Sequence, residues 1–278
     1  MLLRVLIIIF SLLLIVIITL AILRSRHDRK INQLWKTLQS PTGEKLFDSS
    51  MVSGLPEPAR RYFLHTIAPG AVLARFAAIE MEGRIGLKSG EEKYPFKAWQ
   101  IIASPRGMIW QAHVGKGIMR MSGDDSFVED KGAMNWYLWG IIPIVRAEGP
   151  DLSRSTAGRV ALETPWLLPS ALLLKNAAKW EAIDDTTVRL YITIGAEKLA
   201  PVLKISPEGK LEKTEMMRWD PEGLNGTPEY VLWIGTMMSE EQTFGGYTIP
   251  TKVSVTARAG TPQENQFFEA TIRRAEFR

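Results

Sequence analysis

The chain of 278 residues contains no cysteine, and this absence excludes disulfides, thiolate nucleophiles and thiolate metal ligands together. Histidine is also scarce, with three in the chain. His65 has no second ligand at helical spacing, so we expect it to be packed or on the surface and expect no metal site. The chain also has only a small excess of basic over acidic residues, with a net charge of +4. Five of its basic residues flank the first apolar run. The nearly neutral remainder lacks the basic footprint of a nucleic-acid-binding protein.

A long apolar run near the N-terminus predicts a membrane anchor. Residues 5–23 read "VLIIIFSLLLIVIITLAIL". As a helix they span roughly 28 Å at about 1.5 Å per residue, close to a bilayer core of about 30 Å. A cleaved signal peptide is the alternative, but it has a shorter apolar region and ends at a small-residue site. The run ends instead in "AILRSRHDRK". We therefore expect a transmembrane anchor over residues 1–26 that contacts the lipid bilayer through residues 5–23.

The remainder divides into a connecting segment and one domain. In residues 27–54, apolar residues recur at helical spacing in "DRKINQLWKTL", and a loop rich in Pro, Gly and Ser follows. Residues 55–278 read as a single β-rich domain with a helical insert at about 151–176. Short alternating runs with turn residues between them, such as "SPEG" and "FGGY", favour an antiparallel meander over a βαβ alternation.

These features predict an α+β fold that is mainly antiparallel β. An antiparallel sheet of about ten strands tends to curl or close. We expect an N-terminal transmembrane helix, then a curled antiparallel sheet or half-open barrel with a helical hairpin as its plug.

The insert contains the stretch "RVALETPWLLPSALLL". Arg159 and Glu163 are four residues apart and thus neighbours on a helical face. Glu163 has no His, Lys or second carboxylate nearby in sequence, so we interpret the two as a structural ion pair, with ligand contact and catalysis as the weaker alternatives. Pro165 is expected to end the first helix, and Trp166 to enter the open end of the sheet before a second helix starts near Pro169.

A cluster of carboxylates lies in "GDDSFVED", residues 123–130. Hard cations such as Ca²⁺ prefer oxygen ligands, but the run lacks the glycine-centred spacing of a calcium-binding loop. We therefore interpret it as a polar hairpin tip.

The chain is rich in Trp and Met, with nine and eleven respectively. Most of these residues should form the core. A curled sheet wider than its side chains fill encloses a cavity, and Trp and Met suit an adaptable apolar lining. The candidates for lining such a cavity are Trp110, Met119, Met121, Trp136, Trp139, Trp166 and Trp233.

Four motifs carry a resemblance to a known family: "LPEPARRYF", "GKGIMRMSGDDSFVEDKGAMNWYL", "AGRVALETPWLLPSALL" and "WEAID". In this order they resemble a family of uncharacterised bacterial membrane-associated proteins, classed as a domain of unknown function. The match runs from about Leu55 onward and implies no established activity. The strand–helix–strand layout is also similar to the half-open β-barrels of periplasmic lipoprotein carriers and lipid-binding sensors.

The resemblance and the charges that flank the apolar run disagree about the side of the membrane on which the body lies. Four basic residues lie within residues 24–30, whereas Arg4 stands alone before the run, and the positive-inside rule then places the body in the cytoplasm. The carrier-like layout implies the extracytoplasmic face, which we favour.

Three functions are consistent with the sequence. We favour a membrane-anchored, non-catalytic module that binds a lipid or another apolar ligand in a half-barrel, with no cofactor. A structural or interaction protein with a filled core is the second, its protein partner unspecified by the sequence. A hydrolase or transferase is the third, disfavoured because no nucleophile–base constellation is evident.

Overall fold

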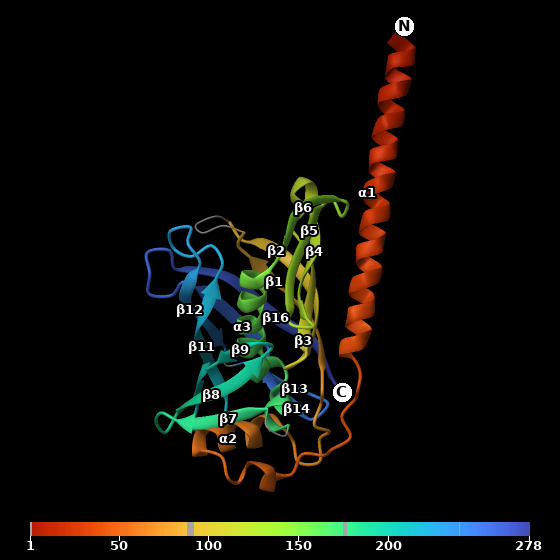
Figure 1. Cartoon of the computed structure of the whole chain (residues 1–278). Coiled ribbons are helices and arrows are strands. Elements are labelled where there is room, and N and C mark those ends of the chain that lie inside the picture. The colour runs from red at the N-terminus through yellow and green to blue at the C-terminus, as the bar shows by residue number, and fades with distance from the viewer. Residues whose placement is uncertain (1, 88–91, 175–176, 239) are drawn as a thin grey trace.

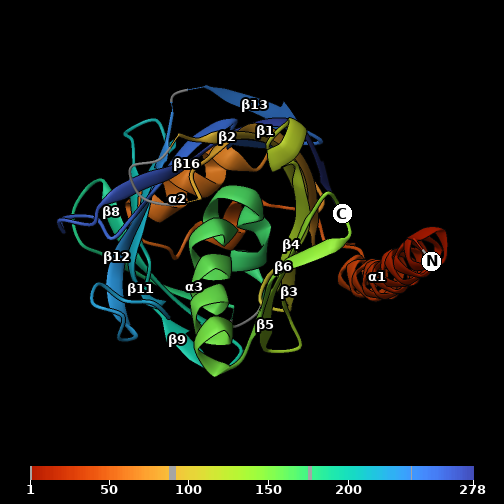
Figure 2. The ribbon, with the colours of Figure 1, turned by 90° about the horizontal axis from the view of Figure 1, so that it is seen from above.

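The computed structural model describes residues 2–87, 92–174, 177–238 and 240–278. A strongly curled antiparallel sheet surrounds one helix, and a long N-terminal helix projects beyond this body (Figures 1 and 2). The predicted fold class is therefore confirmed. Residues 1, 175 and 176, at the limits of the predicted anchor and insert, lie outside the described residues.

The helices of the described part are α1 (Leu2–Leu38), α2 (Glu57–Thr66) and α3 (Pro150–Leu167), with short 3₁₀ helices η1 (Ser49–Val52), η2 (Gly117–Met119) and η3 (Pro169–Leu173). The strands before α3 are β1 (Ala77–Ile85), β2 (Tyr94–Ala103), β3 (Gly107–Val114), β4 (Met121–Val128), β5 (Lys131–Leu138) and β6 (Ile142–Glu148). Those after α3 are β7 (Ala178–Ala182), β8 (Thr187–Ile194), β9 (Glu197–Leu199), β10 (Val202–Ile205), β11 (Leu211–Asp220), β12 (Glu229–Met237), β13 (Glu241–Phe244), β14 (Tyr247–Pro250), β15 (Lys252–Ala257) and β16 (Asn265–Phe277).

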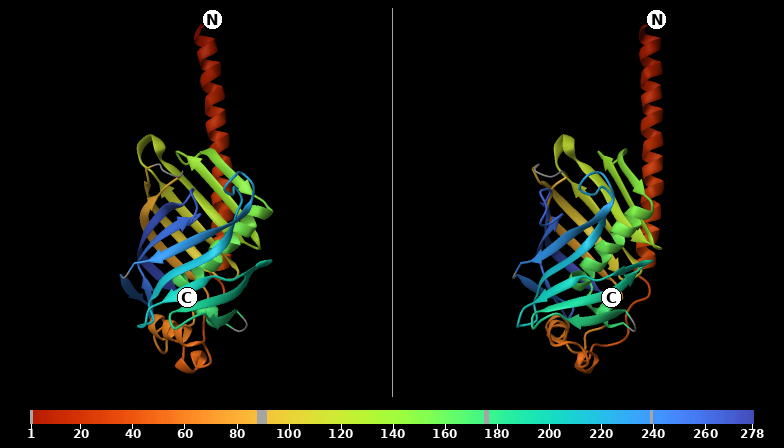
Figure 3. Two further views of the ribbon diagram at one scale, coloured as in Figure 1. Left: turned by 90° about the vertical axis from the view of Figure 1, so that its left-hand side faces the viewer. Right: turned by 60° about the vertical axis from the view of Figure 1, so that its left-hand side comes forward.

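The sheet joins both halves of the chain. Its order is β6-β5-β4-β3-β2-β1-β16-β15-β12-β11-β10-β8-β7, with β9 beside β8, and β13 and β14 form a separate pair. The last strand, β16, pairs with the first, β1, over nearly the whole of β1. Strands before and after α3 therefore form one surface. The edge strands β6 and β7 do not meet, so the curled sheet is a half-open barrel (Figure 3).

Successive side chains of a strand point to opposite faces of the sheet, and this alternation decides which of them enter the core. In β8, for example, Val188, Leu190, Ile192 and Ile194 are buried while the residues between them are not. Inward side chains such as these pack against α3, which lies within the curl (Figure 2). Trp110 of β3 and Ile79 of β1 belong to the same cluster. Many of the buried residues of α3 are small or apolar, such as Ala157 and Val160, and its polar residues find partners on the sheet.

The insert differs from the predicted hairpin in one respect, because Pro165 does not end the first helix. α3 continues to Leu167, and the Leu168 N–H still donates to the Thr164 carbonyl at 2.9 Å. The Pro165 carbonyl accepts from the hydroxyl of Tyr62 in α2. A proline inside a helix costs about 3 kcal/mol, and complete burial of Leu167 and near-complete burial of Trp166 offset this cost. The second segment does begin at Pro169, as the short helix η3.

The carboxylates of residues 123–130 are also placed differently from the prediction. Only Glu129 and Asp130 lie at a hairpin tip, where both have positive φ. Asp124 and Asp125 lie inside β4, which is buried along its whole length. Their partners explain this burial, since a carboxylate oxygen of Asp124 lies 2.6 Å from Nε2 of His27 in α1, and Asp125 pairs with Arg159 of α3 at 3.0 Å.

Helix α1 is continuous through the predicted anchor and the segment that follows it. It is long and apolar enough to cross a membrane, and that apolar window has no buried residue. Its C-terminal part packs on the convex face of the sheet, where Ile31 and Leu38 are buried with Ile101 and Ile109. One helix thus connects the apolar run rigidly to the body (Figure 1).

Burial of Trp166 yields a stability prediction. Its side chain is 4% exposed and its indole N–H donates to the Pro250 carbonyl at 2.8 Å. Trp166→Ala should lower the free energy of unfolding by about 3–5 kcal/mol, the range for large-to-small core substitutions. Denaturant titration of the detergent-solubilised chain measures this change. Trp99→Ala, at a site 41% exposed, is the matched control. Equal, small losses for both variants would mean that Trp166 does not anchor the insert.

Candidate functional site

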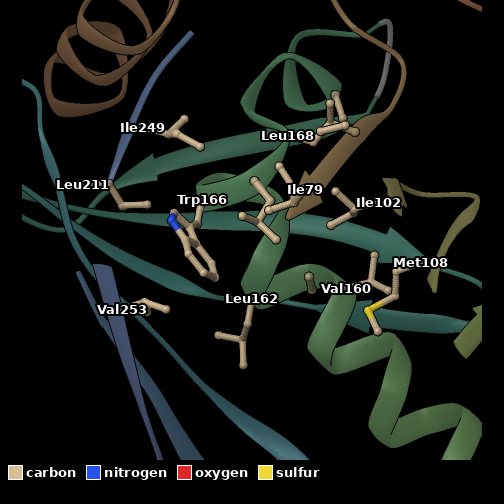
Figure 4. Packing of buried hydrophobic residues seen from close by; sticks show 14 of the residues in the cluster. Ile79, Ile102, Met108, Val160, Leu162, Trp166, Leu168, Leu211, Ile249 and Val253 are labelled. Carbon is tan, nitrogen blue, oxygen red and sulfur yellow. The ribbon is translucent and has the colours of Figure 1, made fainter. Parts of the chain in front are cut away.

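A cavity of about 200 Å³ lies between α3 and the inner face of the sheet. This volume is several times the roughly 30 Å³ share of one water molecule in the liquid. Leu162 and Trp166 of α3 face Val253 of β15 across this region (Figure 4). Its lining is mainly aliphatic and aromatic, and the remaining wall residues include Ile85, Trp110, Met134, Trp233, Met237, Val255, Phe267 and Phe268.

Three of the predicted cavity candidates line this space: Trp110, Trp166 and Trp233. Trp136 lies directly behind the wall, with its ring centroid 5.9 Å from that of Trp110. Met121 is buried in the surrounding core. The cavity therefore gathers aromatic residues from β3, β12 and α3, which are distant in the sequence.

Two candidates lie elsewhere, and their assignment to the cavity is corrected. Met119 is 44% exposed and Trp139 is 54% exposed. Met119 ends the short helix η2 in the β3–β4 connection, where Gly115 and Gly117 adopt positive φ. Trp139 lies in the turn after β5, also with positive φ. Both residues belong to the outer end of the sheet.

Polar side chains form a connected group at the edge of the cavity. The Arg159 guanidinium donates to Glu163 at 2.7 Å and to Asp125 at 3.0 Å. Gln100 of β2 donates to the second oxygen of Glu163, and the Trp136 indole donates to Asp125 at 3.0 Å. The predicted pair Arg159–Glu163 is therefore part of a network that connects α3 with β2, β4 and β5.

Burial and charge act in opposite directions within this network. Burial raises the pKa of Asp125 although Arg159 and the Trp136 indole favour its ionised form. Burial also opposes the charge of Arg159, but the carboxylates of Glu163 and Asp125 outweigh it and leave its pKa raised. Arg159 consequently stays charged, and both oxygens of Glu163 are already engaged by donors.

A second cation, Arg218 of β11, lines the cavity without such neutralisation. It donates to the carbonyl and the hydroxyl of Ser155 at 2.8 and 3.2 Å. Its guanidinium lies 4.1 Å from the centroid of the Trp233 ring, a cation–π contact. In the described part of the chain it makes no ion pair, whereas Arg159 makes two. Burial, and then the charge of Arg159, lower the pKa of Arg218 to about 10.

Sequence reasoning missed Arg218, Asp125 and Gln100 as site residues. Arg218 follows Thr214 and Met216 at intervals of two on the inner face of β11, where both of the others are buried. This alternation is the one signal that could have identified it. Asp125 gave no such signal, because its partner Arg159 is 34 residues away.

Residues 45–270 match the model of a family of unknown function, DUF6544. The chain belongs to this family. No curated protein matches the DUF6544 chain in sequence. Among solved structures, a LolA superfamily protein of Nitrosomonas europaea is similar, at 11% identity and a TM-score of 0.43, over 86% of this chain and 94% of that one. A putative outer membrane lipoprotein-sorting protein domain of Vibrio parahaemolyticus is similar at 12% identity and a TM-score of 0.38, over 83% and 92%.

The walls of this DUF6544 cavity combine apolar side chains with the guanidinium of Arg218. Apolar walls give affinity for hydrocarbon, and a guanidinium with a free donor at one wall gives affinity for an acceptor group. Within the residues described, no three His, Asp or Glu side chains gather as metal ligands would. His65, the residue considered for metal binding, is 3.0 Å from a carboxylate oxygen of Glu241.

The network around Arg159 predicts an order of stabilities. Arg159→Met should destabilise most, by about 3–5 kcal/mol, because it leaves two carboxylates without their cation. Glu163→Ala should cost less, and Glu163→Gln least, because the amide retains the shape and one acceptor. Denaturant titration measures all three. Arg189→Met, which removes a half-exposed pair with Glu181, is the control and should cost at most about 1 kcal/mol. A larger loss for Glu163→Gln than for Glu163→Ala would contradict the structural role.

Proposed function

We propose that this DUF6544 protein is a membrane-anchored, non-catalytic module that holds a lipid or another apolar ligand in its half-barrel. The cavity between α3 and strands β11, β12, β15 and β16 is the observation that carries the proposal. A filled core would leave no such space, because protein interiors are packed as densely as organic crystals. The purely structural alternative is disfavoured for this reason.

The position of Arg218 supports a ligand that is amphipathic. A hydrocarbon chain suits the walls formed by Leu162, Val255 and Phe267, but it leaves the Arg218 guanidinium without an anion. A carboxylate or phosphate at the end of the chain would supply one, in a charge-assisted hydrogen bond. We therefore propose an acyl chain with an anionic end as the ligand class.

The state of Glu163 supports a non-catalytic role. A general acid or base must reach its substrate through a free oxygen. Both Glu163 oxygens accept hydrogen bonds, one from Arg159 and one from Gln100. Reaction chemistry at this carboxylate would first require these two bonds to break.

The anchor is proposed to be the apolar part of α1, residues 5–23. Every residue in this run except Leu20 is exposed, which is unfavourable in water and favourable in hydrocarbon. The run is also continuous with the part of α1 that packs on the sheet. Such an arrangement keeps the cavity within one helix length of the bilayer that would supply or receive a lipid.

Filling the cavity tests the binding function. Val255→Phe adds four carbon atoms to the cavity wall, so it should narrow the space and reduce the amount of co-purified lipid several-fold, without loss of folding. Native mass spectrometry of the full chain, extracted from membranes in mild detergent, measures the bound mass directly.

Met217→Phe is the control for this experiment. Met217 neighbours Arg218 on β11 but is 52% exposed on the opposite face, so its substitution should leave bound lipid unchanged. A wild-type spectrum that contains only the mass of the chain would contradict the proposal.

We propose that the body is extracytoplasmic, against the charge of the segment after the run. Arg24 contributes to that charge, but it also pairs with Asp28 at 3.0 Å and lies over the Tyr137 ring. These contacts give Arg24 a structural role that does not depend on the orientation of the chain in the membrane.

An alkaline phosphatase fusion after Arg278 tests the sidedness. This reporter requires disulfides, which form outside the cytoplasm, so we expect an active fusion. A green fluorescent protein fusion at the same site is the reciprocal control. An inactive phosphatase fusion together with a bright fluorescent one would place the body in the cytoplasm and overturn this part of the proposal.

A further inference from the structure

The end of the sheet that lies beside α1 carries an exposed apolar surface, which we call the apolar tip. It consists of the β3–β4 connection, residues 115–120, and the β5–β6 turn with the start of β6, residues 138–145. The exposed fractions of its large apolar side chains are 78% for Ile118, 44% for Met119, 54% for Trp139, 46% for Ile144 and 39% for Val145. Large contiguous apolar surface of this kind marks an interaction site.

The apolar tip is ordered by its own hydrogen bonds. The backbone N–H of Trp139 donates to the Arg120 carbonyl at 2.9 Å. The indole N–H of Trp139 donates to the Ile118 carbonyl, also at 2.9 Å. These bonds hold the two loops together, so Ile118 and the Trp139 ring project as parts of one surface.

Contacts along α1 define the height of the tip relative to the apolar run. Near the C-terminal end of α1, Leu38 packs with Val128 at the far end of β4. Eleven residues earlier in the helix, His27 contacts Asp124 in the middle of β4. One turn beyond, the Arg24 guanidinium lies 4.2 Å from the centroid of the Tyr137 ring, near the end of β5. Strands β4 and β5 thus run alongside α1. The apolar tip lies further toward the N-terminus of α1 than Arg24 does.

Arg24 is the first charged residue after the apolar run, so its level is that of the membrane boundary if residues 5–23 span the bilayer. Trp139 follows Tyr137 by two residues, so it lies at most roughly 7 Å further along the chain. One helical turn covers nearly the same height, from Arg24 to Leu20. Leu20 is the residue of the run that is partly covered. Figures 1 and 3 show the β5–β6 turn alongside α1 and directed toward its N-terminus.

Charge at the tip has one sign. Residues 115–120 and 138–145 contain Lys116 and Arg120, and no acidic residue. Both basic residues are exposed. Basic residues close to a membrane are attracted to anionic headgroups, and Trp is favoured at the level of the headgroups because its ring is apolar and its N–H polar.

We propose that the apolar tip is a second membrane contact, in which Ile118, Trp139 and Ile144 enter the headgroup region of an anionic bilayer. The proposal rests on the proposed anchoring by α1. Two contacts, the anchor and the tip, would fix the half-barrel at one orientation to the membrane. Trp110 and Trp136 lie on strands that end at the tip, so this contact would hold the cavity wall close to the bilayer surface.

The absence of cysteine allows a direct test on the full chain. Single-cysteine variants at Ile118, Ile17 and Ile183 are labelled with an environment-sensitive fluorophore and reconstituted into vesicles of phosphatidylcholine and phosphatidylglycerol. Lipids with spin labels in the upper acyl chain act as quenchers. Ile17 lies in the apolar run and reports the anchor. Ile183, 47% exposed after β7, is the matched control far from the tip.

We expect strong quenching at Ile17, quenching at Ile118 several-fold greater than at Ile183, and a blue-shifted emission at Ile118. In the Ile118→Cys chain, Lys116→Gln with Arg120→Gln should reduce the quenching. Quenching at Ile17 with none at Ile118 would overturn the tip contact and leave the anchor intact. A blue shift at Ile118 without quenching would indicate contact with a second protein copy and would also overturn it. Absence of quenching at Ile17 would contradict the anchor itself.

Discussion

The guanidinium of Arg159 ties α3 to the inner face of the sheet, and the position of everything inside the curl follows from this contact. It holds Glu163 on its own helix and Asp125 on β4, at 2.7 and 3.0 Å. Removing one member of such a buried group leaves an uncompensated charge, so alternative positions of the helix are costly. Apolar packing alone tolerates small shifts of a helix, whereas this network specifies one depth and one rotation.

α3 is held against β4 by Arg159 and against β11 by Ser155, but the space between these contacts is incompletely filled. The cavity lies there, between Leu162 and Trp166 of the helix and strands β12 and β15. Arg218 stands at its wall with Ser155 and Trp233 as neutral partners. The result is an apolar space beside one cation that an anionic ligand would neutralise. On the convex side, α1 makes the corresponding fixed contact through Ile31 and His27.

The features that were predictable from the sequence have causes that are local in the chain. The run of residues 5–23 and the spacing of Arg159 and Glu163 depend only on near neighbours, as does strand alternation. Asp124 was not predictable as a buried residue, because its partner His27 is 97 residues away. Met119 and Trp139 are residue types common in protein cores, yet both lie in loops and are exposed. Positive φ at Gly117 and at Trp139 itself shapes these loops. Pro165 stays within α3 because distant tertiary contacts outweigh a local helix-breaking preference.

We propose that the space beside α3 holds an amphipathic ligand taken from the membrane. A crystal structure of the full chain, purified from membranes without added lipid, would show this ligand. We expect elongated electron density between Leu162 and Val255, with its polar end within hydrogen-bond distance of the Arg218 guanidinium. A cavity that contains only ordered water, or that has closed through a shift of α3, would contradict it.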